Sequence, residues 1–231
     1  MKTILISLEQ DEDRRKNATN ILKKYGFCKN FEWFKGIHGK DDVKYFEFIK
    51  TNNFTISKLV YNNKIRFYHN NLRIGVNGLS KGEIGCSLSH LEIYEMLCKD
   101  NNNNSYLIFE DDLNIIVSNE EFNKIIHNLP DVNSYDICHL HESKYFPFYK
   151  EKKENSYFYQ AKRQFFNYTA AYIITKRGAQ KLLNYTYPYF GLPSDDLMSN
   201  AFIFDDNFKV IIPEKPLVTT GNFKSTIGAI N

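Results

Sequence analysis

Short apolar runs alternate with stretches of helical periodicity along most of the chain. The run Thr3–Leu8 predicts a buried first strand, and apolar positions between residues 18 and 25 recur at the spacing of a helix. Phe31–Phe34 predicts a second strand. Because a strand, a helix and a strand in succession favour a parallel pair, this opening predicts an α/β fold.

The same kinds of pattern continue beyond the opening. Ser80 with Glu83, and Ser118 with Glu121, have the spacing of a capping box, which marks a helix start. Residues 41–72 show only weak periodicity and receive no assignment. The other predicted elements are helices at 80–99, 118–129 and 175–183, a helix start at Asp195 and Asp196, and strands at 106–109, 135–140, 169–174 and 208–212.

Three adjacent acids, Glu110, Asp111 and Asp112, follow the apolar run Tyr106–Phe109. They are expected where a buried strand reaches the sheet edge, and ligands of α/β sheets bind beyond the carboxyl ends of strands. Adjacent carboxylates repel one another, and a divalent cation would neutralise them, with oxygen ligands suited to Mg²⁺ or Mn²⁺. The alternative is a solvated acidic turn.

The helix predicted at 80–99 has a second, polar face besides its apolar stripe. Glu83, Ser87, His90 and Tyr94 share that face because they are spaced by four, three and four residues. Small residues near its start let another segment approach the backbone closely. The face either lines a site or packs on a neighbour with a hydrogen-bonded histidine.

Two further groups of polar residues are weaker candidates. Arg14 and Arg15 begin the first helix, where one is expected on a solvated face and the other could reach a phosphate or a base at the sheet edge. His139, His141 and Glu142 could bind a metal. However, alternation along a strand places the two histidines on one face and Glu142 on the other.

Composition narrows the class of protein. The chain has 231 residues, 42% of them apolar and 25% charged, as in globular proteins. A net charge of +3 is too small to indicate nucleic-acid binding. Four cysteines without a CxxC pair indicate free thiols in a reducing compartment. With too short an apolar start for a signal peptide, the prediction is a cytoplasmic protein.

Residues 144–168 combine six Lys or Arg with two Glu, a net charge of +4, and ten aromatic residues. Such a segment could stack on sugars or nucleobases, or contact an anionic membrane surface. The other interpretation, favoured for most of these residues, is a hairpin with aromatic cross-strand pairs and solvated lysines.

The stretch Leu79–His90, followed by Leu107–Asp112, resembles glycosyltransferase family 25, which includes bacterial lipooligosaccharide galactosyltransferases and collagen galactosyltransferases. The resemblance extends to the first strand with its arginines, to Gly178–Leu183, to Pro193–Asp195 and to Ser225–Ile227. It leaves out residues 41–72 and 144–168. The first strand reads Ile-Ser-Leu where the family commonly has Asn in the middle.

The resemblance implies a single GT-A-type domain over residues 1–231, with a mostly parallel central sheet flanked by helices. It implies inverting, metal-dependent transfer of a hexose from a UDP-sugar, usually galactose in bacterial members, with glucose open. The acceptor would be a lipid-linked oligosaccharide of lipooligosaccharide or lipopolysaccharide. Residues 41–72 and 144–168 would select it, and peripheral contact with an anionic inner membrane stays open.

The resemblance also implies roles for individual residues. Asp112 is the first choice as ligand of Mn²⁺ or Mg²⁺, with Glu110 or Asp111 beside it, and Asp111 could instead hold the ribose or the sugar. Inversion requires a base for the acceptor hydroxyl, for which Asp195 is preferred to Asp196. The residues expected at the donor substrate are Leu8, Arg14, Arg15, Glu83, Ser87, His90 and Asp111.

Three other classes of protein share part of this pattern with the transferase. A nucleotidyltransferase also pairs an acid motif with a metal but usually has a glycine-rich loop near its N-terminus, and Ser7–Arg15 contains no glycine. A sugar- or membrane-binding module would need neither the acid cluster nor Asp195. Receiver domains are about half as long and carry paired acids at strand one, which here ends in Ser7-Leu8-Glu9.

Overall fold

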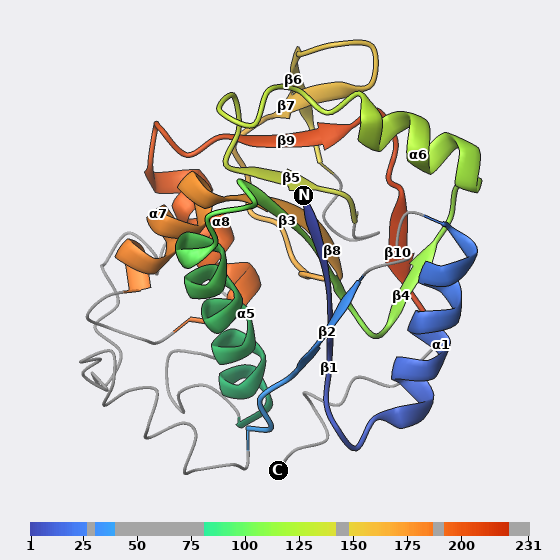
Figure 1. Ribbon diagram of the computed structural model, residues 1–231. Coiled ribbons are helices and arrows are strands. Elements are labelled where there is room, and N and C mark those ends of the chain that lie inside the picture. The colour runs from blue at the N-terminus through green and yellow to red at the C-terminus, as the bar shows by residue number, and fades with distance from the viewer. Residues whose placement is uncertain (27–30, 40–80, 142–147, 187–191, 222–231) are drawn as a thin grey trace.

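An eight-stranded sheet forms the centre of the computed structural model, which describes residues 1–26, 31–39, 81–141, 148–186 and 192–221 (Figure 1). The strand order is β2-β1-β3-β8-β5-β9-β7-β6. The strands are β1 (Lys2–Ser7), β2 (Glu32–Lys35), β3 (Ser105–Glu110), β5 (Ile137–His139), β6 (Lys150–Lys153), β7 (Phe158–Ala161), β8 (Ala171–Thr175) and β9 (Val210–Pro213).

Most strands of this sheet run in one direction. β1 is parallel to both β2 and β3, and β5 is parallel to β9. β8 runs antiparallel to its neighbours β3 and β5, and β7 runs antiparallel to β9 and β6. Only β8 and β7 therefore oppose the other strands among the described residues. The prediction of an α/β fold with a mostly parallel central sheet is confirmed.

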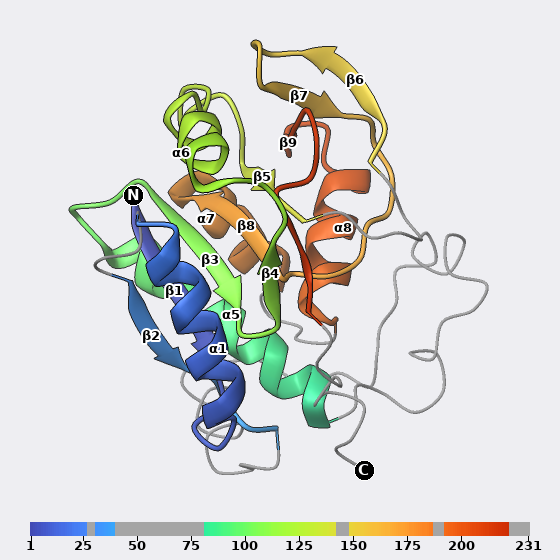
Figure 2. The same cartoon turned by 90° about the vertical axis from the view of Figure 1, so that its right-hand side faces the viewer.

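Helices cover both faces of the sheet (Figures 1 and 2). Alternate residues of β3 point to opposite faces, with Tyr106 and Ile108 in one buried cluster and Leu107 and Phe109 in the other. The first cluster packs under α5 (Lys81–Lys99), α7 (Lys176–Thr186) and α8 (Ser194–Phe204), and the second under α1 (Glu12–Lys24) and α6 (Asn119–His127). The fold thus has three layers.

Local hydrogen bonds explain where two helices begin. The Ser118 hydroxyl accepts the Glu121 N–H at 3.1 Å, as the capping-box spacing predicts. The Thr175 hydroxyl accepts the Gly178 N–H at 3.1 Å at the start of α7. Ser80, the predicted cap of α5, lies outside the described residues.

The structure describes residues 148–168 of the basic aromatic segment 144–168 but none of residues 41–72. β6 and β7 pair in antiparallel register and the lysines of β6 are exposed, so the hairpin with solvated lysines is confirmed for this part of residues 144–168. The expected aromatic cross-strand pairs are not found between these strands, because lysines of β6 lie opposite Ala161, Gln160 and Tyr159. Residues 41–72 lie outside the described part of the chain.

A small second sheet pairs β4 (Leu113–Ile115) with β10 (Val218–Thr220), a strand that the pattern did not predict. Within the described residues, no helix is both long and apolar enough to cross a membrane.

Candidate active site

A pocket lies where β1 and β3 end beside the start of α5. The described residues that line it include several predicted site residues, namely Leu8, Arg14, His90, Glu110, Asp111 and Asp112. The three acids therefore lie at the carboxyl edge of the sheet, where α/β proteins bind ligands. Ser7, Asp11 and Cys86 also line the pocket, although the sequence had not singled them out.

The start of α5 approaches the pocket closely because its small residues permit it. A Cβ atom on Gly85 would lie 2.7 Å from the backbone nitrogen of Gly39, so only glycine fits there. The Ser89 hydroxyl accepts the Ile37 N–H at 2.8 Å from the same segment. The close approach expected from the small residues is therefore confirmed. The segment that approaches them is the backbone of Ile37 and Gly39.

Arg14 supplies the positive charge beside the acid cluster. Its guanidinium lies 2.5 Å from an Asp111 carboxylate oxygen and 3.6 Å from an Asp112 oxygen. Asp111 is 5% exposed, and burial raises its pKa despite the nearby Ser7 hydroxyl and Arg14. One cation thus faces three neighbouring carboxyl groups, so the cluster has an excess of negative charge.

Asp112 is the acid of this cluster whose environment best fits a metal ligand. Burial, with the charge of Glu110, raises its pKa to about 7. Its Oδ1 atom is buried and has no hydrogen-bond partner among the described residues. A buried carboxylate oxygen without a partner is unfavourable unless it binds a cation. The donor set of carboxylate oxygens fits Mn²⁺ or Mg²⁺.

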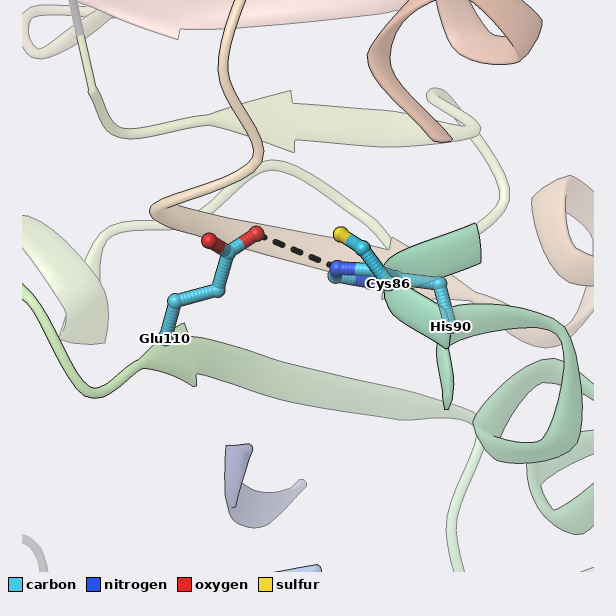
Figure 3. Close-up of side chains that lie close together, drawn as sticks. All are labelled: Cys86, His90 and Glu110. Atoms are coloured by element: carbon cyan, nitrogen blue, oxygen red, sulfur yellow. Dashed lines mark hydrogen bonds and ion pairs between the residues drawn. The ribbon is translucent and has the colours of Figure 1, made fainter. Parts of the chain in front are cut away.

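Glu110 faces a different set of partners, on α5 and in the segment just before β8. His90 Nε2 lies 3.1 Å from its Oε1 (Figure 3). The Thr169 hydroxyl donates to the same oxygen. Burial raises the pKa of Glu110, but the hydrogen bond and charge of His90 outweigh it, so the pKa lies below its usual value. His90 Nδ1 lies 2.6 Å from the Tyr172 hydroxyl, which lies 2.9 Å from the Tyr94 hydroxyl. Two residues of the predicted polar face of α5, His90 and Tyr94, therefore belong to an internal hydrogen-bond network, and His90 also lines the pocket.

Asp195 and Asp196 begin α8, as predicted, and occupy different environments. The two carboxylate oxygens of Asp195 accept the backbone N–H groups of Tyr168 at 3.1 Å and Asp196 at 2.9 Å. Burial and the nearby Glu110 charge still raise the pKa of Asp195. Burial followed by the charge of Asp195 raises the pKa of Asp196 to about 8. Asp196 is therefore mainly protonated at neutral pH.

Three of the predicted donor residues do not line the pocket in the described structure. Arg15 stacks on the Trp33 ring, 4.2 Å from its centroid, and donates to the Leu8 carbonyl at 2.7 Å. Ser87 donates to the Leu192 carbonyl at 3.1 Å, which joins α5 to the segment before α8. Glu83 lies near Asp196 and contributes to its raised pKa. Of the two arginines, Arg14 is therefore the one at the site.

His139, the last residue of β5, and His141, two residues further on, are both buried in the described structure. His139 Nδ1 lies 2.6 Å from the His141 carbonyl and its Nε2 lies 3.0 Å from the Tyr168 carbonyl. Burial lowers the pKa of both histidines to about 4, so each is neutral at pH 7. They join no group of three ligands within the described residues, and Glu142 lies outside them. The weak metal hypothesis gains no support.

Tyr168 has a strained backbone beside the site. Its φ of 74° is a left-handed conformation that a bulky residue rarely adopts. Its N–H donates to Asp195 and its carbonyl oxygen lies 3.0 Å from His139 Nε2, so contacts on both sides of the residue hold it there. Strain of this kind concentrates at functional sites. No sequence signal identified Tyr168, Thr169 or Tyr172, because the site brings them together only in three dimensions.

Comparison with known proteins decides the family. The family model of glycosyltransferase family 25, described as an LPS biosynthesis protein family, matches residues 1–198. The chain belongs to glycosyltransferase family 25. The observed fold, a mostly parallel central sheet flanked by helices, is the one that the resemblance implied. No curated protein shows significant similarity to this family 25 chain.

One solved structure aligns with the family 25 chain over nearly its whole length. It is the crystal structure of a glycosyltransferase involved in the glycosylation of the major capsid of PBCV-1. The alignment covers 96% of this chain and 93% of that one, at 7% sequence identity and a TM-score of 0.42.

Proposed function

We propose that this family 25 glycosyltransferase transfers a hexose, with galactose as first choice, from a UDP-sugar to a lipid-linked oligosaccharide of lipooligosaccharide or lipopolysaccharide. The transfer would invert the anomeric configuration and depend on Mn²⁺ or Mg²⁺. The observation that carries the proposal is the buried Asp112 oxygen, which has no partner among the described residues, in an acid cluster that lines a pocket beside Arg14.

Asp112 is the first ligand of the metal in this proposal, with Glu110 second. A bound cation would neutralise the charge that develops on the diphosphate leaving group. Arg14 would add a fixed positive charge toward the same phosphates. Asp111 holds the Arg14 guanidinium in place, and this ion pair accounts for its burial without a contact to the sugar.

Asp195 is the better choice for the base that accepts the proton of the acceptor hydroxyl. Two backbone N–H groups stabilise its charged form and fix its orientation. Asp196 has no comparable stabilisation, and its pKa of about 8 keeps a proton on it at neutral pH. A protonated carboxyl group cannot accept a second proton, so Asp196 would serve as a neutral neighbour.

The β6–β7 hairpin is the proposed contact with an anionic membrane at the cytoplasmic face. Lys150, Lys152 and Lys153 are exposed on β6, and Tyr149 beside them is 63% exposed. Lysines also protect an edge strand from pairing with other chains, and β6 is such an edge. Co-sedimentation with anionic vesicles at low salt separates the two explanations. Binding that Lys150→Glu with Lys152→Glu abolishes supports membrane contact, and no binding rejects it.

A donor screen tests the proposed reaction. Purified protein with Mn²⁺ is incubated with UDP-galactose, UDP-glucose and other UDP-hexoses, together with an oligosaccharide acceptor from lipooligosaccharide. NMR of the product reports which sugar was transferred and its anomeric configuration. The proposal expects transfer from UDP-galactose with inversion. Retention of configuration would exclude the single displacement with Asp195 as base.

A further inference from the structure

Three side chains of different chemistry, those of Cys86, His90 and Glu110, lie close together in the lining of the pocket. Cys86 and His90 lie one turn apart on α5, and Glu110 ends β3 opposite them (Figure 3). One ligand atom of each residue lies within 4.8 Å of the ligand atoms of the other two. We propose that Cys86, His90 and Glu110 bind one thiophilic divalent cation, with Zn²⁺ as the best match, at a site distinct from the oxygen site at Asp112.

The donor set distinguishes this site from the one at Asp112. Thiolate, imidazole and carboxylate are the ligands from which proteins build zinc sites. Mn²⁺ and Mg²⁺ prefer oxygen, so a sulfur ligand selects against them. The spacing of Cys86 and His90 by four residues places both on one face of the helix, as a shared metal requires. With three protein ligands, a fourth position remains for water.

Neighbouring hydroxyl groups hold the three ligands in place. The Tyr172 hydroxyl lies 2.6 Å from His90 Nδ1 and so orients Nε2 toward Glu110. The Thr169 hydroxyl donates to Glu110, and the Ser194 hydroxyl lies 3.6 Å from Cys86 Sγ. Zinc ligands in proteins are typically oriented by such outer contacts. The ligands therefore need little rearrangement to bind a cation.

Glu110 couples the two sites, a consequence that rests on the proposed function. A cation held by Cys86 and His90 would withdraw Glu110 from the metal at Asp112. Zn²⁺ should therefore weaken the stabilisation by UDP and Mn²⁺ in the wild type. It should weaken that stabilisation much less in Cys86→Ser, because the serine hydroxyl is a poor ligand for Zn²⁺.

Cobalt is the direct probe, since Co²⁺ bound to a thiolate gives a charge-transfer band in the near ultraviolet. Metal-free full-length protein is titrated with Co²⁺ in the absence of nucleotide, and Zn²⁺ is then added to displace it. We expect one equivalent to bind with the band, and Cys86→Ser to lose the band. Cys98→Ser is the matched control on the same helix and should keep it, because Cys98 Sγ contacts only the Lys176 carbonyl at 3.9 Å among its described hydrogen bonds.

Two more variants make the result decisive. Asp112→Asn should keep the cobalt band, so failure of the proposed donor site would not affect this test. Tyr172→Phe keeps all three ligands and should weaken Co²⁺ binding about 10–100-fold, which serves if Cys86→Ser does not fold. The proposal is overturned if excess Co²⁺ gives no band with the wild type. Survival of the band in Cys86→Ser, or its loss in Cys98→Ser, overturns it as well.

Discussion

Two pairs of adjacent aspartates lie near Glu110, and they differ in what holds them. In the first pair, Asp111 binds Arg14, and Asp112 has a buried oxygen without a partner among the described residues. In the second pair, Asp195 accepts two backbone N–H groups. Asp112 and Asp196 are the members with pKa values raised to about 7 and 8. Burial raises the pKa of all four aspartates, but Arg14 favours the charged form of Asp111 and two backbone N–H groups favour that of Asp195, so Asp112 and Asp196 ionise with the greater difficulty.

The surroundings decide which member of each pair carries the proposed chemistry. Asp112 lines the pocket and lies beside two other acids, so a cation can bind and keep it ionised. Asp196 is 7% exposed and, like Asp195, is not among the described residues that line that pocket; burial and the charge of Asp195 raise its pKa to about 8, so it is mainly protonated at neutral pH. Asp112 is therefore the proposed metal ligand of the first pair. In the second pair the proposed proton acceptor is Asp195, and not Asp196.

The largest expected effect comes from removing the proposed base. Asp195→Asn should lower kcat about 10²–10⁴-fold, the usual contribution of a general base. Binding of UDP with Mn²⁺ should stay near the wild-type level, because Asp195 is not among the described residues that line the pocket of the acid cluster. Steady-state kinetics and isothermal titration calorimetry give the two quantities. An Asp196→Asn variant that loses as much kcat as Asp195→Asn would reverse the assignment.

Asp136 provides a reference aspartate whose role is structural. It is fully buried and binds Arg177 at 2.7 Å and Lys181 at 2.9 Å. Asp136→Asn leaves both cations without their partner and should lower the free energy of unfolding by about 3 kcal/mol. Urea denaturation measures it. Nucleotide affinity of the folded variant should be unchanged, and a large loss of affinity would mean that stability and site geometry are not separable here.

The raised pKa of Asp196 predicts a pH dependence of stability. A carboxyl group whose pKa is about 8 in the folded protein binds its proton more tightly than in the unfolded chain. The proton bound to Asp196 contributes its full stabilisation below about pH 4, the usual pKa of an aspartate in an unfolded chain. This stabilisation falls as the pH rises above about 4 and is lost once the pH has passed about 8. Asp196→Asn cannot ionise, so at pH 9 it should be more stable than the wild type by about 1 kcal/mol or more. Parallel curves for the two proteins from pH 5 to 9 would contradict the raised pKa.

Arg15 gives the smallest expected effect and separates the two arginines. Arg15→Gln removes the stacking on Trp33 and should cost about 0.5–1 kcal/mol of stability, with UDP affinity retained. Arg14→Gln should weaken UDP binding in the presence of Mn²⁺ instead, because Arg14 lies at the acid cluster. Thermal unfolding and titration calorimetry on both variants test the contrast. Equal losses of affinity would place Arg15 at the nucleotide.

Local patterns were sufficient for most of the fold. Apolar runs predicted the strands, and the Ser118 cap and the Thr175 start predicted two helices that the structure contains. The strand β10 was missed because its three residues, Val218–Thr220, are too few to carry a period. The sequence pattern also did not predict that β8 runs antiparallel to its neighbours, because strand direction depends on pairing partners far apart in the chain.

The candidate site was predictable only where its residues are close in the sequence. Glu110, Asp111 and Asp112 form one continuous motif, and Asp195 and Asp196 begin one helix. The structure then separated Arg14 from Arg15, since only packing places Arg15 on Trp33. Cys86 could have been found as the residue one turn before His90 on the same face. Tyr168 and Thr169 could not, because their contacts to Asp195 and Glu110 join distant segments.

Nucleotide-dependent thermal stability tests the central claim, the metal site at Asp112, most directly. The unfolding temperature of the wild type and of Asp112→Asn is measured with UDP, with Mn²⁺ and with both. At 100 times its dissociation constant, a ligand of the folded state adds about 2.7 kcal/mol of stability. The account predicts stabilisation of the wild type only by UDP and Mn²⁺ together, and its loss in Asp112→Asn. Equal stabilisation of both proteins, or none in the wild type, would contradict it.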